Sequence, residues 1–388
     1  MTAVATVCMF ALAALVCGLL LAFTPYLMRR NECFAVTVPT AAQADSRLAA
    51  LKQRYAAIMV AVTVASTAVS TVAGLLIVRG TEQPGGALGG MAEGTAVGLG
   101  VSLICAALLV PAVASFALML SFRKRVMAVK RAEGWVAGQR ERTAVLGEED
   151  VPGPVPLAWN LLYVAVVLLT AAIGLALYPA MPDMIPMHAD FSGNVISYVE
   201  KSAGTVFGFP LAMEAFMALV FFGCHAMIVH SKRPTDPGAP ATSALAYGMF
   251  ARAQSMFLLV TGVLVSGGIG VGFMLSSAGV VTLGQMGTAL MVVCALVLVG
   301  AIALSLVYGQ NGARLFRRMQ GDDRLPDDDD ERWKLGVFYV NPDDASVFLP
   351  KRFGIGWTLN FARPAAWATV LGLVALTVVF VVVVWLLG

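Results

Sequence analysis

The amino-acid sequence contains eight apolar runs, each long enough to cross a lipid bilayer as a helix. A bilayer core of about 30 Å needs roughly 20 apolar helical residues to cross it. Only 13% of the 388 residues are charged, whereas soluble domains carry about 25%. The sequence therefore predicts an all-α integral membrane protein with about eight transmembrane helices. We expect these helices at about residues 3–28, 55–78, 96–122, 157–179, 205–229, 249–275, 285–308 and 365–387.

Positive charges gather in every second connecting segment. Several Arg and Lys residues follow the first, third, fifth and seventh runs, whereas the other connections carry at most one. Cytoplasmic loops of membrane proteins carry an excess of Lys and Arg. We therefore expect the basic segments in the cytoplasm, and both termini on the outer side together with the loop after the fourth run.

These patterns divide the chain into five parts. They are a three-helix membrane part (1–122), a basic cytoplasmic linker (123–156), a four-helix membrane core with an outer loop at 178–204 (157–308), a cytoplasmic module (309–364) and a last transmembrane helix (365–388). Inside the module, the acidic run at 322–330 lacks the spacing of a calcium-binding loop, so we predict a solvated linker. The six cysteines form no C-x-x-C pair, so we expect no disulfide framework and no zinc site. No other cofactor is expected.

The outer loop is the segment richest in chemically distinctive residues. Three prolines at 179, 182 and 186 end the preceding helix and keep the chain extended. His188 is the only histidine on the predicted outer side, and its charge would respond to external pH between about 5 and 8. One interpretation is a metal or ligand site with nearby carboxylates such as Asp183, Asp190 and Glu200; the other, favoured for a single histidine, is a hydrogen bond that braces the loop. The candidate sensing residues are Pro182, Asp183, Pro186, His188, Asp190, Gly193, Tyr198 and Lys201.

The order Pro-Asp-x-Ile-Pro-x-His at 182–188, with Gly193, Tyr198 and Lys201 after it, resembles the signature loop of a bacterial family of multi-pass membrane proteins. That family includes the SdpI-type immunity and signalling proteins. The chain departs from the pattern at Asp190, where Asn is usual, and at Ile196, where Asp is frequent. The resemblance implies an inner-membrane protein that senses or sequesters a toxic or signalling peptide outside and informs a cytoplasmic regulator.

Two ionisable residues interrupt the fifth apolar run. Glu214 stands near mid-membrane, where an ionisable group costs at least ~2.5 kcal/mol. His225 follows after about three helical turns and shares its face. This stripe predicts either a proton or ion path, or a protonated Glu214 bonded to a neighbour such as Gln254 with His225 near the interface. A small-solute or proton-coupled transporter that uses Glu214 is accordingly the alternative function.

The sixth run carries Gly262, Ser266 and Gly270 at intervals of four. Small residues one turn apart let a neighbouring helix approach closely. We favour close packing of a central helix here over a gating hinge.

The cytoplasmic module ends in a segment of strand-like and aromatic residues at 332–361. Its pattern predicts a hairpin of strands 337–340 and 346–349 around a turn at 341–344. We expect Lys351 and Arg352, beside aromatic residues, at the lipid interface. The motifs W-K-x-G at 333–336 and K-R-F-G-x-G-W at 351–357 resemble a short uncharacterised module near the C-terminus of some bacterial membrane proteins.

Motifs of several large functional classes are missing. The chain has no H-E-x-x-H, G-x-S-x-G, P-loop or dinucleotide-binding motif, so we predict a protein that is not an enzyme. No aromatic or fold-like pattern accompanies the basic segments, so nucleic acid is not expected as a partner. A third hypothesis is a scaffold subunit, in which the cytoplasmic segments recruit a partner and neither His188 nor Glu214 matters.

Overall fold

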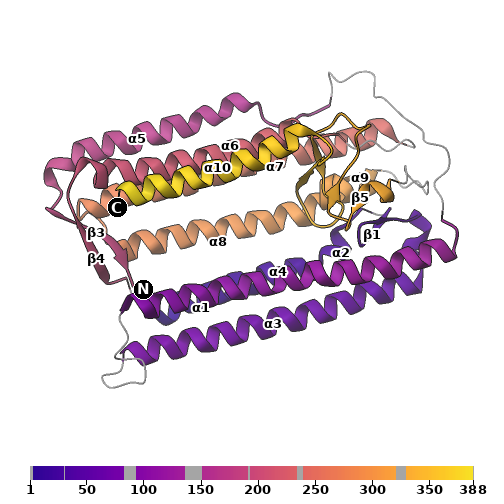
Figure 1. Ribbon diagram of the computed structural model, residues 1–388, viewed down its shortest axis with the longest axis horizontal. Helices are drawn as coiled ribbons and strands as arrows, with labels where there is room; N and C mark the ends of the chain where they lie inside the picture. The colour runs from indigo at the N-terminus through magenta and orange to yellow at the C-terminus, as the bar shows by residue number, and fades with distance from the viewer. Residues whose placement is uncertain are drawn as a thin grey trace.

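The computed structural model describes residues 3–29, 31–82, 93–135, 151–190, 193–233, 239–319 and 329–387. Long helices run side by side, and short strands and loops lie at the two ends of the bundle (Figure 1). Eight of the described helices are long and apolar enough to cross a membrane. The prediction of an all-α, multi-pass membrane protein is confirmed. The eight are α1 (Ala3–Ala22), α3 (Ser46–Glu82), α4 (Glu93–Ala132), α5 (Leu161–Leu177), α6 (Phe209–Val229), α7 (Pro240–Ser277), α8 (Leu283–Tyr308) and α10 (Pro364–Leu387).

The helices expose large apolar side chains to their surroundings. Leu371 and Trp385 of α10 are 64% and 79% exposed, and the most apolar stretches of α8 and α10 bury none of their residues inside the protein. Contiguous apolar surface of this extent is unfavourable in water. A lipid bilayer is the environment that such a surface fits.

The membrane helices form two groups. Helices α1, α3 and α4 pack on one another, as do α5, α6 and α7, while α8 and α10 lie against α7 and α6 respectively. The two groups touch between α1 and α8. Figure 1 shows α8 running between α7 and the first group.

The two ends of the bundle carry different structures. The hairpin of β3 (Met184–Ala189) and β4 (Val195–Glu200) lies at the end where both termini lie (Figure 1). The opposite end carries α2 (Thr24–Leu27), α9 (Ala313–Met319) and three pairs of short strands. These strands are β1 (Glu32–Cys33), β2 (Val36–Thr37), β5 (Trp333–Lys334), β6 (Phe338–Tyr339), β7 (Phe348–Pro350) and β8 (Trp357–Leu359). We call the two ends the hairpin end and the module end.

The predicted hairpin in the C-terminal module is wrong in its pairing. Strand β6 pairs with β5, and β7 pairs with β8. The turn at 341–344 is held instead by Asn360, whose Nδ2 donates to the carbonyl oxygens of Asn341 (2.8 Å) and Asp344 (3.0 Å) and whose Oδ1 accepts from the Asn341 amide (3.0 Å). A side chain that follows β8 satisfies the turn, so β6 and β7 do not pair with each other.

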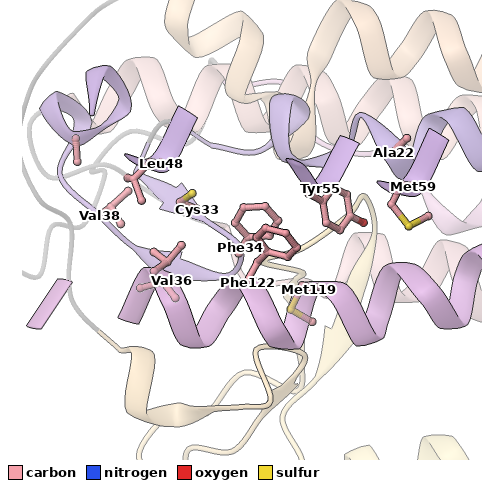
Figure 2. Close-up of a cluster of buried hydrophobic side chains, with 12 residues drawn as sticks. Ala22, Cys33, Phe34, Val36, Val38, Leu48, Tyr55, Met59, Met119 and Phe122 are labelled. Carbon is pink, nitrogen blue, oxygen red and sulfur yellow. The ribbon is translucent and has the colours of Figure 1, made fainter. Parts of the chain in front are cut away.

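A buried aromatic cluster joins the module end to the first helical group. Phe34 lies in the turn between β1 and β2, and its ring is 5.2 Å from Phe122 and 5.3 Å from Tyr55 (Figure 2). Phe353 of the C-terminal module stacks on the same ring at 6.3 Å. Phe34 and Ala35 both have positive φ, which costs energy for residues with a Cβ. Complete burial of Phe34 offsets that cost.

The acidic linker contains a residue that is buried rather than solvated. Residues 320–328 lie outside the described part of the chain, but Asp330 is only 6% exposed. Its carboxylate accepts from Lys130 Nζ (2.6 Å), from the amide and hydroxyl of Thr37 (both 3.0 Å) and from Arg352. Arg352 is likewise buried and pairs with Asp329 and Asp330, so its predicted place at the lipid interface is wrong. Opposite charges from separate segments compensate one another here, which permits their burial.

Candidate functional site

The base of the β3–β4 hairpin is closed by Lys201. Its Nζ donates to the carbonyl oxygen of Met181 (2.9 Å) and lies 4.6 Å from the ring centre of Tyr178, just past the end of α5. Its amide donates to the carbonyl oxygen of Asp183 (2.7 Å). Lys201 therefore satisfies backbone groups that the proline-rich entry leaves open, and it fixes where the hairpin leaves the bundle. Pro182 and Asp183 are exposed beside it.

The tip of the hairpin is shaped by Asp190 and Gly193. The carboxylate of Asp190 accepts from the amide (2.8 Å) and the side chain (3.0 Å) of Asn194, and its carbonyl accepts from the Gly193 amide (3.0 Å). Gly193 has φ +91°, and a Cβ there would lie 3.0 Å from Cα of Gly284, at the start of α8. A glycine is required at this point by both the turn and the close approach of two backbones.

The two faces of the hairpin have opposite environments, because successive side chains along a strand alternate. Ile185 is completely buried in a cluster with Val206, Phe273 and Met274. On the other face Met184 and Tyr198 are 48% and 54% exposed. The hairpin is thus a platform that is seated on α7 and presents its other face to the surroundings.

The outer edge of strand β4 pairs with no described strand, and only its last residue, Glu200, has a carbonyl oxygen that accepts from a side chain, Oγ1 of Thr205 (3.1 Å). Among the described residues the sheet holds β3 and β4 alone, and β3 includes Pro186, which pairs with Tyr198. Proline cannot donate to a further strand, whereas β4 contains no proline. The β4 edge is therefore better suited than the β3 edge to pair with an additional strand.

His188 is exposed and bonds within the hairpin. Its Nδ1 lies 2.7 Å from Oγ of Ser197, its partner across the strands, where the register shifts. No group of three or more His, Cys, Asp and Glu residues lies close enough to hold a metal in the described part of the chain. The geometry thus offers a cross-strand hydrogen bond and an exposed imidazole.

Glu214 of α6 lies completely buried between α5 and α7. Its Oε1 accepts from Oγ1 of Thr170 (2.6 Å), and a Cβ at Gly270 would lie 1.9 Å from the same oxygen. Glycine at 270 therefore makes the space for this carboxyl group. Oε2 has no hydrogen-bond partner among the described residues.

The predicted partner of Glu214, Gln254, is wrong. Gln254 stands sixteen residues before Gly270 on α7, which is about 24 Å along the helix axis. Thr170, on α5, supplies the hydrogen bond instead. The composition of an apolar run does not reveal which of its hydroxyl groups faces a neighbouring helix.

His225 lies buried on α6, toward the module end. Its Nδ1 is 2.9 Å from Nδ2 of Asn160, and its Nε2 is 2.9 Å from the carbonyl oxygen of Val155. Because the amide nitrogen donates, Nδ1 accepts, and Nε2 carries the proton that bonds to the carbonyl. The amide of Val155 in turn donates to Oγ of Ser255 (2.9 Å). His225 thus fixes the segment that enters α5, and both of its nitrogens are used.

The small residues of α7 receive side chains from its neighbours. A Cβ at Gly262 would lie 2.1 Å from the hydroxyl of Tyr163, and the one at Gly270 would meet Glu214. Close packing of α5, α6 and α7 is therefore the observed role of these positions. Sequence reasoning missed Thr170, Asn160 and Ser255; the available sign was a polar residue inside an apolar run.

Two segments of the chain match families whose function is unknown. Residues 165–213 match a domain of unknown function, DUF1648, and residues 342–367 match a family of unknown function, DUF5808. The first match covers most of α5, the whole hairpin and the start of α6; the second covers β7, β8 and the start of α10. The chain matches no curated protein and no solved structure. Both segments with distinctive structure thus recur in other proteins, and neither match carries an activity.

Proposed function

We propose that the protein is a non-enzymatic receptor of the bacterial inner membrane that senses or sequesters a toxic or signalling peptide outside the cell. The β3–β4 hairpin is the binding element in this proposal, with both termini on the same outer side. The likeness of residues 182–201 to the signature loop of SdpI-type immunity and signalling proteins supports it. The observation that carries it is the β4 edge, which pairs with no further described strand, on an anchored platform.

An extended peptide that adds to β4 would gain main-chain hydrogen bonds, which is how many receptors capture peptides without a deep pocket. Met184 and Tyr198 lie on the exposed face and would give apolar contact to alternate side chains of the peptide.

Helix α7 contacts both the hairpin and the module end. Phe273 and Met274, near the end of α7, pack in the cluster that holds Ile185. Near the start of the same helix, the ring of Phe250 stacks 5.9 Å from Trp357 in β8. Helix α7 has 38 residues and is about 57 Å long. It gives a direct route by which occupancy of the hairpin would reach a cytoplasmic regulator bound at the module.

The test uses cells that express the full chain. These cells are exposed to the peptide fraction secreted by the bacterium from which the protein comes. We expect His188→Ala and Tyr198→Ala to lower survival or reporter response at least tenfold, with equal amounts of protein in the membrane fraction. His230→Ala is the matched control, because His230 is also exposed but lies at the end of α6 toward the module. Full activity of the His188 variant would eliminate the hairpin as the binding element.

Labelling provides the topological check. A cysteine at position 188 should react with a membrane-impermeant maleimide on intact cells, whereas one at position 334 should react only after the membrane is opened. The reverse pattern would place the hairpin in the cytoplasm and exclude an external ligand.

Proton-coupled transport is the second candidate, and the carboxyl group of Glu214 favours it. Its Oε2 lies buried at membrane depth without a partner among the described residues, and such groups mark ion or proton pathways in many membrane proteins. In reconstituted vesicles, Glu214→Gln would then abolish proton or solute flux. A receptor without transport would show no flux in either form.

A further inference from the structure

A cavity of about 370 Å³ lies where the two helical groups meet, at the module end. Its walls come from α1, α2, α4, α8, the loop between β7 and β8, Gln310 just after α8, and Val337 between β5 and β6. Volumes of 300–1,000 Å³ are typical of sites that hold small organic ligands, by the rough range for such sites. The cavity lies far from the hairpin, so the receptor proposal does not use it.

One side of the cavity is apolar and lies at the level where membrane helices end. Leu20 and Leu21 of α1 and Phe116 and Met119 of α4 line it. Helix α1 ends at Ala22, only one or two residues beyond these leucines. Phe116 is 40% exposed, so an acyl chain of a surrounding bilayer would have access to this wall.

The other side carries two polar side chains that are able to form further hydrogen bonds or ion pairs. Gln310 is 1% exposed; its Nε2 donates to the carbonyl oxygen of Lys351, and its Oε1 has no hydrogen-bond partner among the described residues. The Lys351 ammonium forms neither an ion pair nor a hydrogen bond with any residue that the structure describes. A buried acceptor without a donor destabilises a protein, unless a ligand supplies that donor.

We propose that this cavity binds an anionic phospholipid whose headgroup carries hydroxyl groups. The acyl chain lies along Leu20, Leu21, Phe116 and Met119, the ammonium of Lys351 pairs with the phosphate, and a headgroup hydroxyl donates to Oε1 of Gln310. Each part of such a lipid has a matching group in the cavity. The hydrocarbon contacts the apolar wall, the anion pairs with the cation, and the hydroxyl donor bonds to the acceptor that has no partner among the described residues. Lipid bound here lies between the two helical groups, which also touch between α1 and α8 and through the C-terminal module.

The experiment is native mass spectrometry of the purified full chain with added dioleoyl phosphatidylglycerol. We expect Lys351→Gln to weaken binding of this lipid about fivefold, as for loss of one cation near an anionic headgroup. Lys334→Gln is the matched control, because Lys334 is an exposed lysine of the same module that does not line the cavity. It should bind the lipid as the parent does.

Two further arms separate the parts of the ligand. Dioleoyl phosphatidylcholine should bind at least fivefold more weakly than phosphatidylglycerol, and Gln310→Leu should reduce that preference. Inorganic phosphate should not displace the bound lipid. The proposal is overturned if Lys351→Gln retains parental binding, if Lys334→Gln loses as much, if the two lipids bind equally, or if phosphate alone displaces the lipid.

Discussion

The two ends of the molecule differ in how their polar side chains find hydrogen-bond partners. At the hairpin end, polar side chains bond to groups nearby in the sequence: Asp190 to Asn194, four residues away, and His188 to Ser197, nine away. At the module end, Asp330 bonds to Thr37 and Lys130, which are 293 and 200 residues away.

The difference indicates what each end is able to do. Local bonds hold the hairpin in shape while its face and one strand edge stay exposed, which suits capture of a partner. Long-range bonds between buried charges tie the first helical group to the C-terminal module. Burial is strong enough there to raise the pKa of the Glu32 carboxyl group, although Arg29 and Arg352 lie near it and oppose the shift.

The largest effect is expected from the removal of the Asp330 carboxylate. Asp330→Ala leaves Lys130 and Arg352 buried without their shared partner, and loss of one member of a buried ion pair costs about 3–5 kcal/mol. Asp343 is the matched control: its carboxylate is 73% exposed and lies 3.2 Å from Arg332, so Asp343→Ala should cost at most about 1 kcal/mol. Thermal unfolding in detergent measures both. Equal stability of the two variants would remove the contrast between the ends.

An intermediate effect is expected from glycines with positive φ at the two ends. Gly193→Ala at the hairpin tip introduces backbone strain of about 1–2 kcal/mol and also brings Cβ to within 3.0 Å of Gly284. Gly354→Ala at the module end has a similar φ of +82° but no atom within 4 Å of the new Cβ. Gly193→Ala should lose more stability than Gly354→Ala. The hairpin amide hydrogens of Gly193→Ala should also exchange faster than those of the parent. If both lose the same amount, the contact between the hairpin tip and α8 contributes nothing.

The smallest effect concerns acid stability at the module end. Burial alone would raise the pKa of the Asp344 carboxyl group, but hydrogen bonds from Lys232 and Ser346 outweigh it and lower the pKa below its ordinary value of 3.8. A lowered pKa stabilises the folded state above the unfolded pKa, and this stability is lost as the pH falls below about 3.8. Unfolding followed at decreasing pH should show that loss in the parent and a flatter dependence in Asp344→Asn. An identical pH dependence in both would show that the Lys232–Asp344 pair does not influence folding.

Much of the architecture follows from the amino-acid order alone, because membrane insertion depends on the length and polarity of each segment. Eight apolar runs predict eight spanning helices, and the three prolines after the fourth run place an extended segment where the hairpin lies. The glycine and serine positions of the sixth run likewise predict the close packing of α7, since the volume of a side chain is a property of the residue itself.

The partners of polar groups depend on tertiary structure. The sequence assigns Gln254 to Glu214, a lipid interface to Arg352 and solvent to Asp330, whereas the fold brings Thr170, the Asp329–Asp330 pair and Lys130 to these groups. The choice among possible partners is made when helices distant in the sequence pack and exclude water, and only then does an unpaired charge become costly. Local order therefore determined how many times this chain crosses the membrane, and packing alone decided which polar groups meet inside it.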